Sequence, residues 1–140
     1  MFRLVLLSMC IVLASLLPAT HAVEPLERAQ VSSPHLENSL GNPISKNVNI
    51  NQQVQITADI TNNQEFPQDF VYIVQVKNNE EVIIHLVWFK VKFEPGQKFS
   101  PAISWVTDSS GTFVAEIFVW ERLTNQDALS KPVFINITAS

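Results

Sequence analysis

The sequence predicts an all-β domain of the immunoglobulin-like antiparallel β-sandwich class, with about seven strands, preceded by a helical signal peptide. Apolar and polar residues alternate along most of the chain after residue 47, which is the period of a strand and not of a helix. Pro, Gly, Asn and Asp residues separate these alternating segments at short intervals. The length of 140 residues fits a single domain of this kind.

The first 22 residues have the pattern of a cleavable secretory signal peptide. Arg3 precedes an uncharged, mostly apolar run over residues 4–17, and Thr20-His21-Ala22 supplies the small residue expected before a cleavage site. The run has 14 residues, fewer than the roughly 20 that span a bilayer. A retained membrane anchor is therefore the less favoured alternative.

The next segment, residues 23–46, is rich in Ser, Pro, Asn and Glu, and we interpret it as a tether. It could contain a first strand near residues 35–40, before a turn at Gly41-Asn42-Pro43. The predicted organisation is thus a signal peptide (1–22), a tether (23–46) and a sandwich domain (47–140).

Residues 54–61 form the clearest strand, because apolar side chains alternate strictly with Gln55, Thr57, Asp59 and Thr61. Further strands are predicted at 70–77, 82–93, 98–107, 112–123 and 132–138, with turns at Asn78-Asn79-Glu80, Glu94-Pro95-Gly96-Gln97 and Asp108-Ser109-Ser110-Gly111. In the second of these turns, Pro95 presets its own φ angle and Gly96 takes the position where φ can be positive.

Three segments resemble motifs of one family of secreted sandwich domains. Residues 54–63 (VQITADITNN) are similar to its second strand, and residues 93–97 (FEPGQ) to its L-x-P-G-x turn. Ser104-Trp105 followed by Gly111-Thr112-Phe113 is similar to its W-x(n)-G-x-Y run, although Phe93 and Phe113 replace the usual Leu and Tyr. The chain thus resembles the CARDB (cell-adhesion-related) family over about residues 40–138. Its closest resemblance is to small exported proteins of ammonia-oxidising archaea, which implies an extracellular adhesion or assembly module without catalytic residues.

The residues themselves favour no enzyme, cofactor or metal site. The three glycines all lie in predicted turns, so the sequence has no glycine-rich phosphate loop. Cys10, the only cysteine, would leave with the signal peptide, which excludes a disulfide and a blue-copper centre in the mature domain. His85 lies in an apolar strand without the companions that a metal-ligating histidine normally has, so we expect a structural role. Asn136 begins the only N-glycosylation sequon and is a candidate glycosylation site.

Charge argues against nucleic acid as a partner. Removal of residues 1–22 leaves eight Lys and Arg against 13 Asp and Glu, a formal net charge of −5. Nucleic-acid binding calls for clustered positive charge instead.

The two expected sheets differ in their outer faces. The sheet with strands 54–61 and 98–107 should be polar outside, with Phe99, Ile103 and Trp105 turned inward. The strands of the other sheet stay apolar on both sides. The residues expected on its outer face are Val71, Ile73, Ile84, Leu86, Trp88, Phe118 and Trp120. Exposed apolar patches beyond a few hundred Å² usually mark an interaction site. Alternatively, a β-bulge reverses one of these strands, or the tether covers the face.

We therefore expect a non-enzymatic interaction or assembly module, secreted or at the cell surface, that binds a protein partner or a second copy through this face. The alternative is a carbohydrate-binding module in which Trp88 and Trp120 stack on sugar rings. The apolar neighbours Ile84, Leu86 and Phe118 favour a protein partner. Contact with a membrane is expected only through an uncleaved signal peptide.

Overall fold

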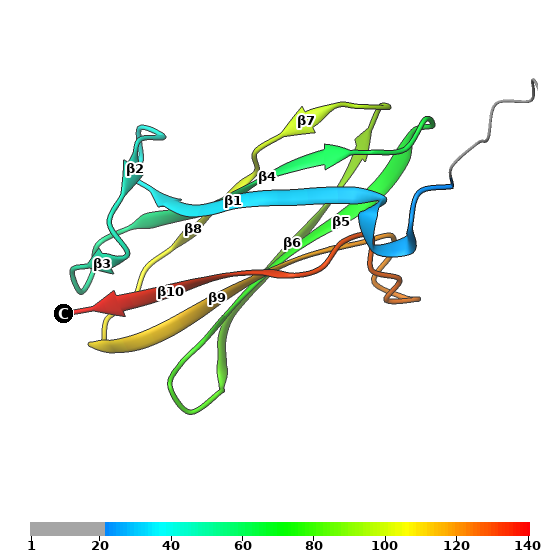
Figure 1. Cartoon of the computed structure of the whole chain (residues 1–140). Coiled ribbons are helices and arrows are strands. Elements are labelled where there is room, and N and C mark those ends of the chain that lie inside the picture. Colours follow the sequence, from blue (N-terminus) through cyan, green and yellow to red (C-terminus); the bar gives the residue numbers. More distant parts are fainter. Residues whose placement is uncertain (1–21) are drawn as a thin grey trace, which may run out of the picture.

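A computed structural model describes residues 22–140, which form two β-sheets packed face to face (Figure 1). The predicted all-β sandwich is confirmed. The predicted signal peptide lies outside the described residues, apart from Ala22. Within residues 22–140, no helix has the length and apolar character needed to cross a membrane.

The first sheet, called sheet A here, has the strand order β2-β1-β4-β7, and β8 also pairs with β4. Its strands are β1 (Ala29–Glu37), β2 (Pro43–Ile44), β4 (Val54–Asn62), β7 (Lys98–Phe99) and β8 (Ala102–Trp105). A 3-10 turn, η1 (Pro25–Glu27), precedes β1.

The second sheet, called sheet B here, has the strand order β3-β10-β9-β5-β6. Its strands are β3 (Asn47–Val48), β5 (Gln68–Lys77), β6 (Ile83–Phe93), β9 (Gly111–Trp120) and β10 (Val133–Ala139). All its pairings are antiparallel except that of β3 with β10, which is parallel. The turn between β5 and β6 extends beyond the neighbouring strands (Figure 1).

The segment expected to be a tether is largely part of the sandwich. β1 pairs with β4 along its length and buries Ala29 and Leu36. The first strand of the sandwich therefore begins at Ala29, before the predicted boundary at Asn47. The alternation that marks a strand is weak here because β1 contains a bulge at Ser33-Pro34, where Ser33 has a φ of 53°.

The predicted strand 98–107 is divided into β7 and β8. Pro101 lies between them, and proline has no N–H group to donate to the sheet. Ile103 and Trp105 face the core as predicted. The prediction for Phe99 was wrong: its side chain is exposed at the sheet edge, with its ring 5.9 Å from that of Phe93.

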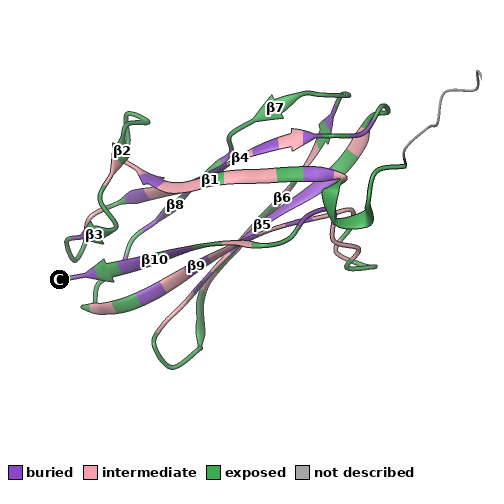
Figure 2. Ribbon diagram, viewed as in Figure 1, coloured by how far each residue is buried: buried purple, intermediate pink, exposed green. Residues whose placement is uncertain are grey.

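The core lies between the sheets and is rich in aromatic side chains. Tyr72 and Phe70 are among its largest fully buried residues, and the Trp105 and Phe113 rings meet edge to face at 5.2 Å. In Figure 2 the buried positions alternate with exposed ones along the strands. The core of the described residues runs from Ala29 to Ala139, so a chain that starts at Val23 contains all of it.

Asn62 connects the sheets at one end of the sandwich. Its fully buried side-chain Nδ2 donates to the carbonyl oxygens of Phe66 (3.0 Å), Phe93 (3.3 Å) and Glu94 (3.3 Å). Its Oδ1 accepts from the backbone N–H of Gln64 at 3.0 Å. The sequence pattern predicted only a polar loop here. The adjoining turn is confirmed, with Gly96 at a φ of 69°.

Candidate interaction surface

Strand register brings aromatic and aliphatic side chains together on the outer face of sheet B. Ile73 on β5 lies between Trp88 on β6 and Phe118 on β9. Two residues along β5, Val71 lies beside Trp120. The ring centroids of Phe118 and Trp120 are 6.0 Å apart. Five of the seven residues expected on this face thus occupy adjacent positions.

The remaining two lie on β6. Leu86 is paired with Gln75 on β5, and Ile84 lies at a bulge near the start of the strand. This bulge comes before the regular pairing of β6, which starts at His85. It therefore does not change which side chains of the rest of β6 face outward. The segment expected to be a tether does not cover this face either, because β1 belongs to sheet A.

These side chains differ in exposure. Val71 (1% exposed) and Ile73 (5%) are buried, although they do not belong to the core between the sheets. Neighbouring side chains on the outer face therefore cover them, and they form its floor without being available to a partner. Leu86 (56%) and Trp88 (49%) are exposed, as is Phe134 (52%) on β10. We call the accessible set the aromatic face: Ile84, Leu86, Trp88, Phe118, Trp120 and Phe134.

A polar cluster lies within the aromatic face. Gln75 and Glu116 are directly paired across β5 and β9, and the Gln75 amide donates to the Glu116 carboxylate. The Lys77 ammonium group also donates to Glu116, at 3.3 Å, and this bond raises the pKa of Lys77. The side chains of Gln75 and Lys77 thus already donate hydrogen bonds to Glu116. A partner would therefore meet rings and aliphatic chains more than free hydrogen-bonding groups.

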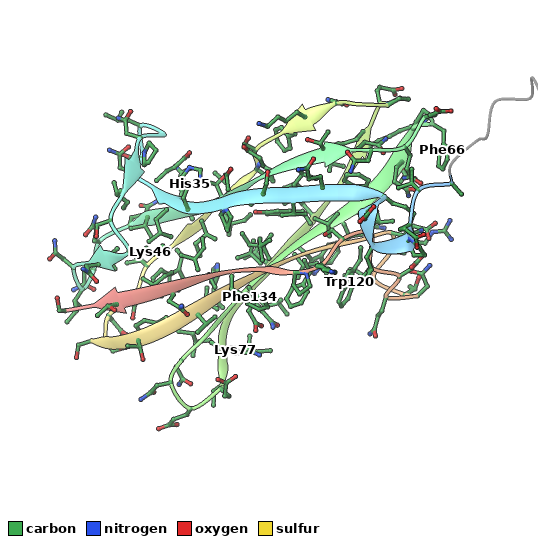
Figure 3. All side chains as sticks on the ribbon, in the orientation of Figure 1. His35, Lys46, Phe66, Lys77, Trp120 and Phe134 are labelled. Atoms are coloured by element: carbon green, nitrogen blue, oxygen red, sulfur yellow. The ribbon has the colours of Figure 1, made fainter. Side chains whose placement is uncertain are left out.

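Figure 3 shows how the labelled side chains are distributed over the molecule. Lys77, Trp120 and Phe134 come from β5, from the end of β9 and from β10, all in sheet B. His35 comes from β1 in sheet A. The aromatic face and the surface that carries His35 therefore belong to different sheets.

One end of the aromatic face is charged. A hollow of about 310 Å³ lies where β5, β6 and β9 meet this end, with Lys90, Lys92 and Arg122 on its walls together with Asp69 and Glu121. An apolar centre with a charged rim is the usual arrangement of a protein–protein interface.

His85 lies on β6, beside an open hollow that also includes Asn51, Asp108 and Ser109. Its ring nitrogen Nε2 is buried and has no hydrogen-bond partner among the described residues. Across residues 22–140, no three His, Cys, Asp or Glu side chains lie close enough together to hold a metal ion.

Asn136 is exposed on β10, next to Val114 of β9. Its side chain lies two residues from Phe134, on the same side of the strand. A glycan on Asn136 would therefore extend from the sheet face that carries the aromatic face.

Comparison with known proteins supports the fold. No protein family matches the sequence, and none of the curated proteins searched matches it. The C-terminal domain of wzt is similar in structure, with a TM-score of 0.64 and 14% identity over 81% of this chain and 74% of that chain. The CARDB domain of a Pyrococcus furiosus protein, solved in complex with di-metal ions, has a TM-score of 0.56 and 9% identity over 83% of this chain and 97% of that chain.

A β-glucosidase from Erythrobacter marinus is also similar, with a TM-score of 0.58 and 10% identity over 80% of this chain, but over only 15% of that chain. At these identities the likenesses show an immunoglobulin-like, CARDB-type sandwich and nothing of its chemistry.

Proposed function

We propose that this chain is a non-enzymatic, exported interaction module that binds a protein partner through the aromatic face. The observation that carries the proposal is the row formed by Trp88 of β6, Ile73 of β5 and Phe118 of β9, in which the Trp88 ring is about half exposed, with the exposed Leu86 beside Trp88 on the same strand. The outer side of β4 in sheet A is polar by contrast, and there Asp59 accepts a hydrogen bond from Ser100 at 2.6 Å. The likeness to an archaeal CARDB domain supports an adhesion-type role.

A protein partner suits the face better than a sugar. Tryptophan is enriched among the residues that contribute most to protein–protein binding. Carbohydrate recognition needs free polar groups beside the stacking rings, but Gln75 and Lys77 already bond to Glu116. Carbohydrate binding is the second candidate, because the half-exposed ring of Trp88 could stack on a sugar.

Export is part of the proposal. The pattern of residues 1–22 supports it, as does the absence of cysteine from the rest of the sequence, which leaves no thiol to react outside the cell. Protein recovered from the culture medium should have Val23 at or near its N-terminus.

The test compares the chain from Val23 onward with two variants of the aromatic face, Trp120→Glu and Phe134→Lys, neither of which is on β6. Each places a charge in an apolar contact, so the affinity for an extracellular protein partner should fall at least tenfold. Leu40→Glu is the matched control, because Leu40 is an exposed apolar residue in the turn between β1 and β2.

The measurement is cross-linking to extracellular proteins of the native source, followed by titration with the purified partner. Thermal unfolding of Phe134→Lys and Leu40→Glu should stay close to that of the wild type, because both residues are exposed. Trp120→Glu also uncovers Val71 and should lower the unfolding temperature, so its affinity is measured well below that temperature. Equal affinity of the wild type and both face variants would contradict the proposal. Binding to polysaccharide instead, with loss in Trp88→Ala, would support the second candidate.

A further inference from the structure

We propose that two copies of this chain pair through the free edge of β6. The two strands lie antiparallel about a two-fold axis, so that sheet B of one copy continues into sheet B of the other. This pairing is made by the backbone edge of the sheet, and the added strand would also cover part of Leu86 and Trp88, which belong to the aromatic face.

The first step concerns the backbone of β6. This strand has 11 residues, forms one edge of sheet B and pairs only with β5. In the part of the chain that the structure describes, no backbone hydrogen bond joins β6 to any strand other than β5. Its outer N–H and C=O groups are therefore available to another strand.

Two of the other sheet edges are interrupted. Pro101 separates β7 from β8, and β1, which pairs with β2 only at Leu36 and Glu37, has a bulge at Ser33-Pro34. β10 pairs with the short strand β3 only at Thr138 and Ala139, so its preceding residues form a second, shorter free edge. Short edge strands and proline both discourage pairing with another chain. The bulge at Ile84 and the charges of Lys90 and Lys92 hinder pairing with another strand at the two ends of β6. Residues 85–89, between them, are regular and include no lysine or carboxylate.

The second step concerns the side chains of that central stretch, which are incompletely covered on both sides. Leu86 and Trp88 are exposed on the outer side. Val87 and Phe89 pack against the core but are only half-buried. A strand added beside β6 covers both sides together, whereas a partner docked on the face covers only the outer side.

The third step concerns charge, which indicates a second copy as the added strand. Glu80 and Glu81 precede β6, and Lys90 and Lys92 lie near its C-terminal end. Antiparallel pairing brings the acidic end of one strand to the basic end of the other. Parallel pairing would bring like charges together. A two-fold axis gives the antiparallel arrangement, in which each surface meets its own copy.

The main test is a charge exchange. One variant carries Lys90→Glu and Lys92→Glu, and the other carries Glu80→Lys and Glu81→Lys. Opposite charges facing each other across strands stabilise pairing and like charges weaken it. We expect the wild type to sediment as a dimer. Each variant alone should have a dimer dissociation constant about tenfold higher than that of the wild type. An equimolar mixture of the two variants should form a heterodimer with the dissociation constant of the wild-type dimer. Misfolding cannot produce that rescue.

Cysteine cross-linking tests the geometry independently, because the chain from Val23 onward has no cysteine. Leu86→Cys lies near the two-fold axis and should form a disulfide with its own copy. Lys92→Cys, near the end of the same strand, should not, because antiparallel pairing separates the two copies of this residue. Phe134→Cys on β10 should not either.

Three results would overturn the proposal. The first is a wild-type chain that remains monomeric at all accessible concentrations. The second is cross-linking through Lys92→Cys or Phe134→Cys in preference to Leu86→Cys, which would indicate parallel or face-to-face contact. The third is a mixture of the charge variants that does not form the heterodimer. None of these results bears on whether the aromatic face binds another protein.

Discussion

Asn62 shows how a single polar side chain can join two apolar sheets. Its amide satisfies three carbonyl groups that belong to the β4–β5 loop and to the end of β6, and all of them lie at one end of the sandwich. Buried backbone carbonyls that lose their partner cost free energy, because water cannot replace the bond.

We expect Asn62→Ala to lower the free energy of unfolding by about 2–4 kcal/mol, since the buried carbonyl of Phe93, the buried N–H of Gln64 and two part-buried carbonyls lose their hydrogen bonds together. Asn62→Asp should be at least as damaging, because a carboxylate oxygen would face the same carbonyl groups. Asn63→Ala is the matched control: its amide bonds only to the exposed carbonyl of Glu27, at 3.0 Å, and its removal should cost less than about 1 kcal/mol. Urea denaturation measures all three, and similar losses for Asn62→Ala and Asn63→Ala would contradict this assignment.

The burial of a side chain could be predicted where it follows from the alternation within its own strand. It could not be predicted where it depends on side chains of neighbouring strands. Trp105 was correctly placed in the core, because its own strand alternates. The burial of Val71 and Ile73 depends on large side chains of the flanking strands β6 and β9, which no pattern within β5 reveals. Asn62 could not be singled out either, since its partners are distant backbone groups.

Among the elements, β1 combines a bulge with a histidine that is hydrogen-bonded through both ring nitrogens. The His35 ring nitrogen Nδ1 bonds to the carbonyl oxygen of Ser33 at 2.6 Å, and Nε2 bonds to Glu37 at 2.9 Å. The bond to Ser33, followed by the bond and the charge of Glu37 and by the charge of Asp59, raises the pKa of His35 above its usual value of 6.5. The folded state therefore holds the proton of His35 more tightly than the unfolded state does.

This element should make stability depend on pH. Because the pKa of His35 is higher in the folded state, its contribution is fully present below about pH 6.5 and is lost as the pH rises through the raised value. We expect His35→Gln to destabilise the protein more at about pH 5.5 than at about pH 8.5, as measured by urea denaturation. Glu37→Gln should reduce the same pH dependence. An equal effect of His35→Gln at both pH values would show that the histidine contributes nothing through its charge.

The regular elements could be predicted, and the irregular ones could not. β4 was predicted within a few residues because strict alternation extends along it, and β5 and β9 because each is a long run of β-branched and aromatic residues with turn signals beside it. β1 was mostly missed because its bulge breaks the alternation, and β3 was missed because two residues are too few to show any period. Pro101 gave a signal for the division between β7 and β8 that the sequence analysis did not use.

For the whole molecule, the position of β1 decides where the folding unit begins. β1 gives β4 its partner on one side and closes the core with Leu36. A chain that starts at Asn47, the predicted boundary, would leave β4 paired only with the short strands β7 and β8.

We expect the chain from Asn47 to lack cooperative thermal unfolding, whereas the chain from Val23 should unfold in a single transition. The removed strand contributes much of one sheet, and a small domain has only about 5–15 kcal/mol of net stability. Near-ultraviolet circular dichroism of the buried aromatic residues is a suitable measurement. If the shorter chain melts cooperatively near the temperature of the longer one, β1 is dispensable and the original boundary is correct.

The arrangement of the first and last strands also affects how the molecule would carry a mechanical load. The 3-10 turn before β1 and the C-terminal end of β10 lie at opposite ends of the sandwich (Figure 1). A force applied between them would act along the strands, so that β1 would slide against β4, and β10 against both β9 and its parallel neighbour β3. The hydrogen bonds of each pair would then bear the force together and would not open one after another. A sandwich loaded in this direction resists tension along its length more strongly than one whose strands are pulled apart sideways.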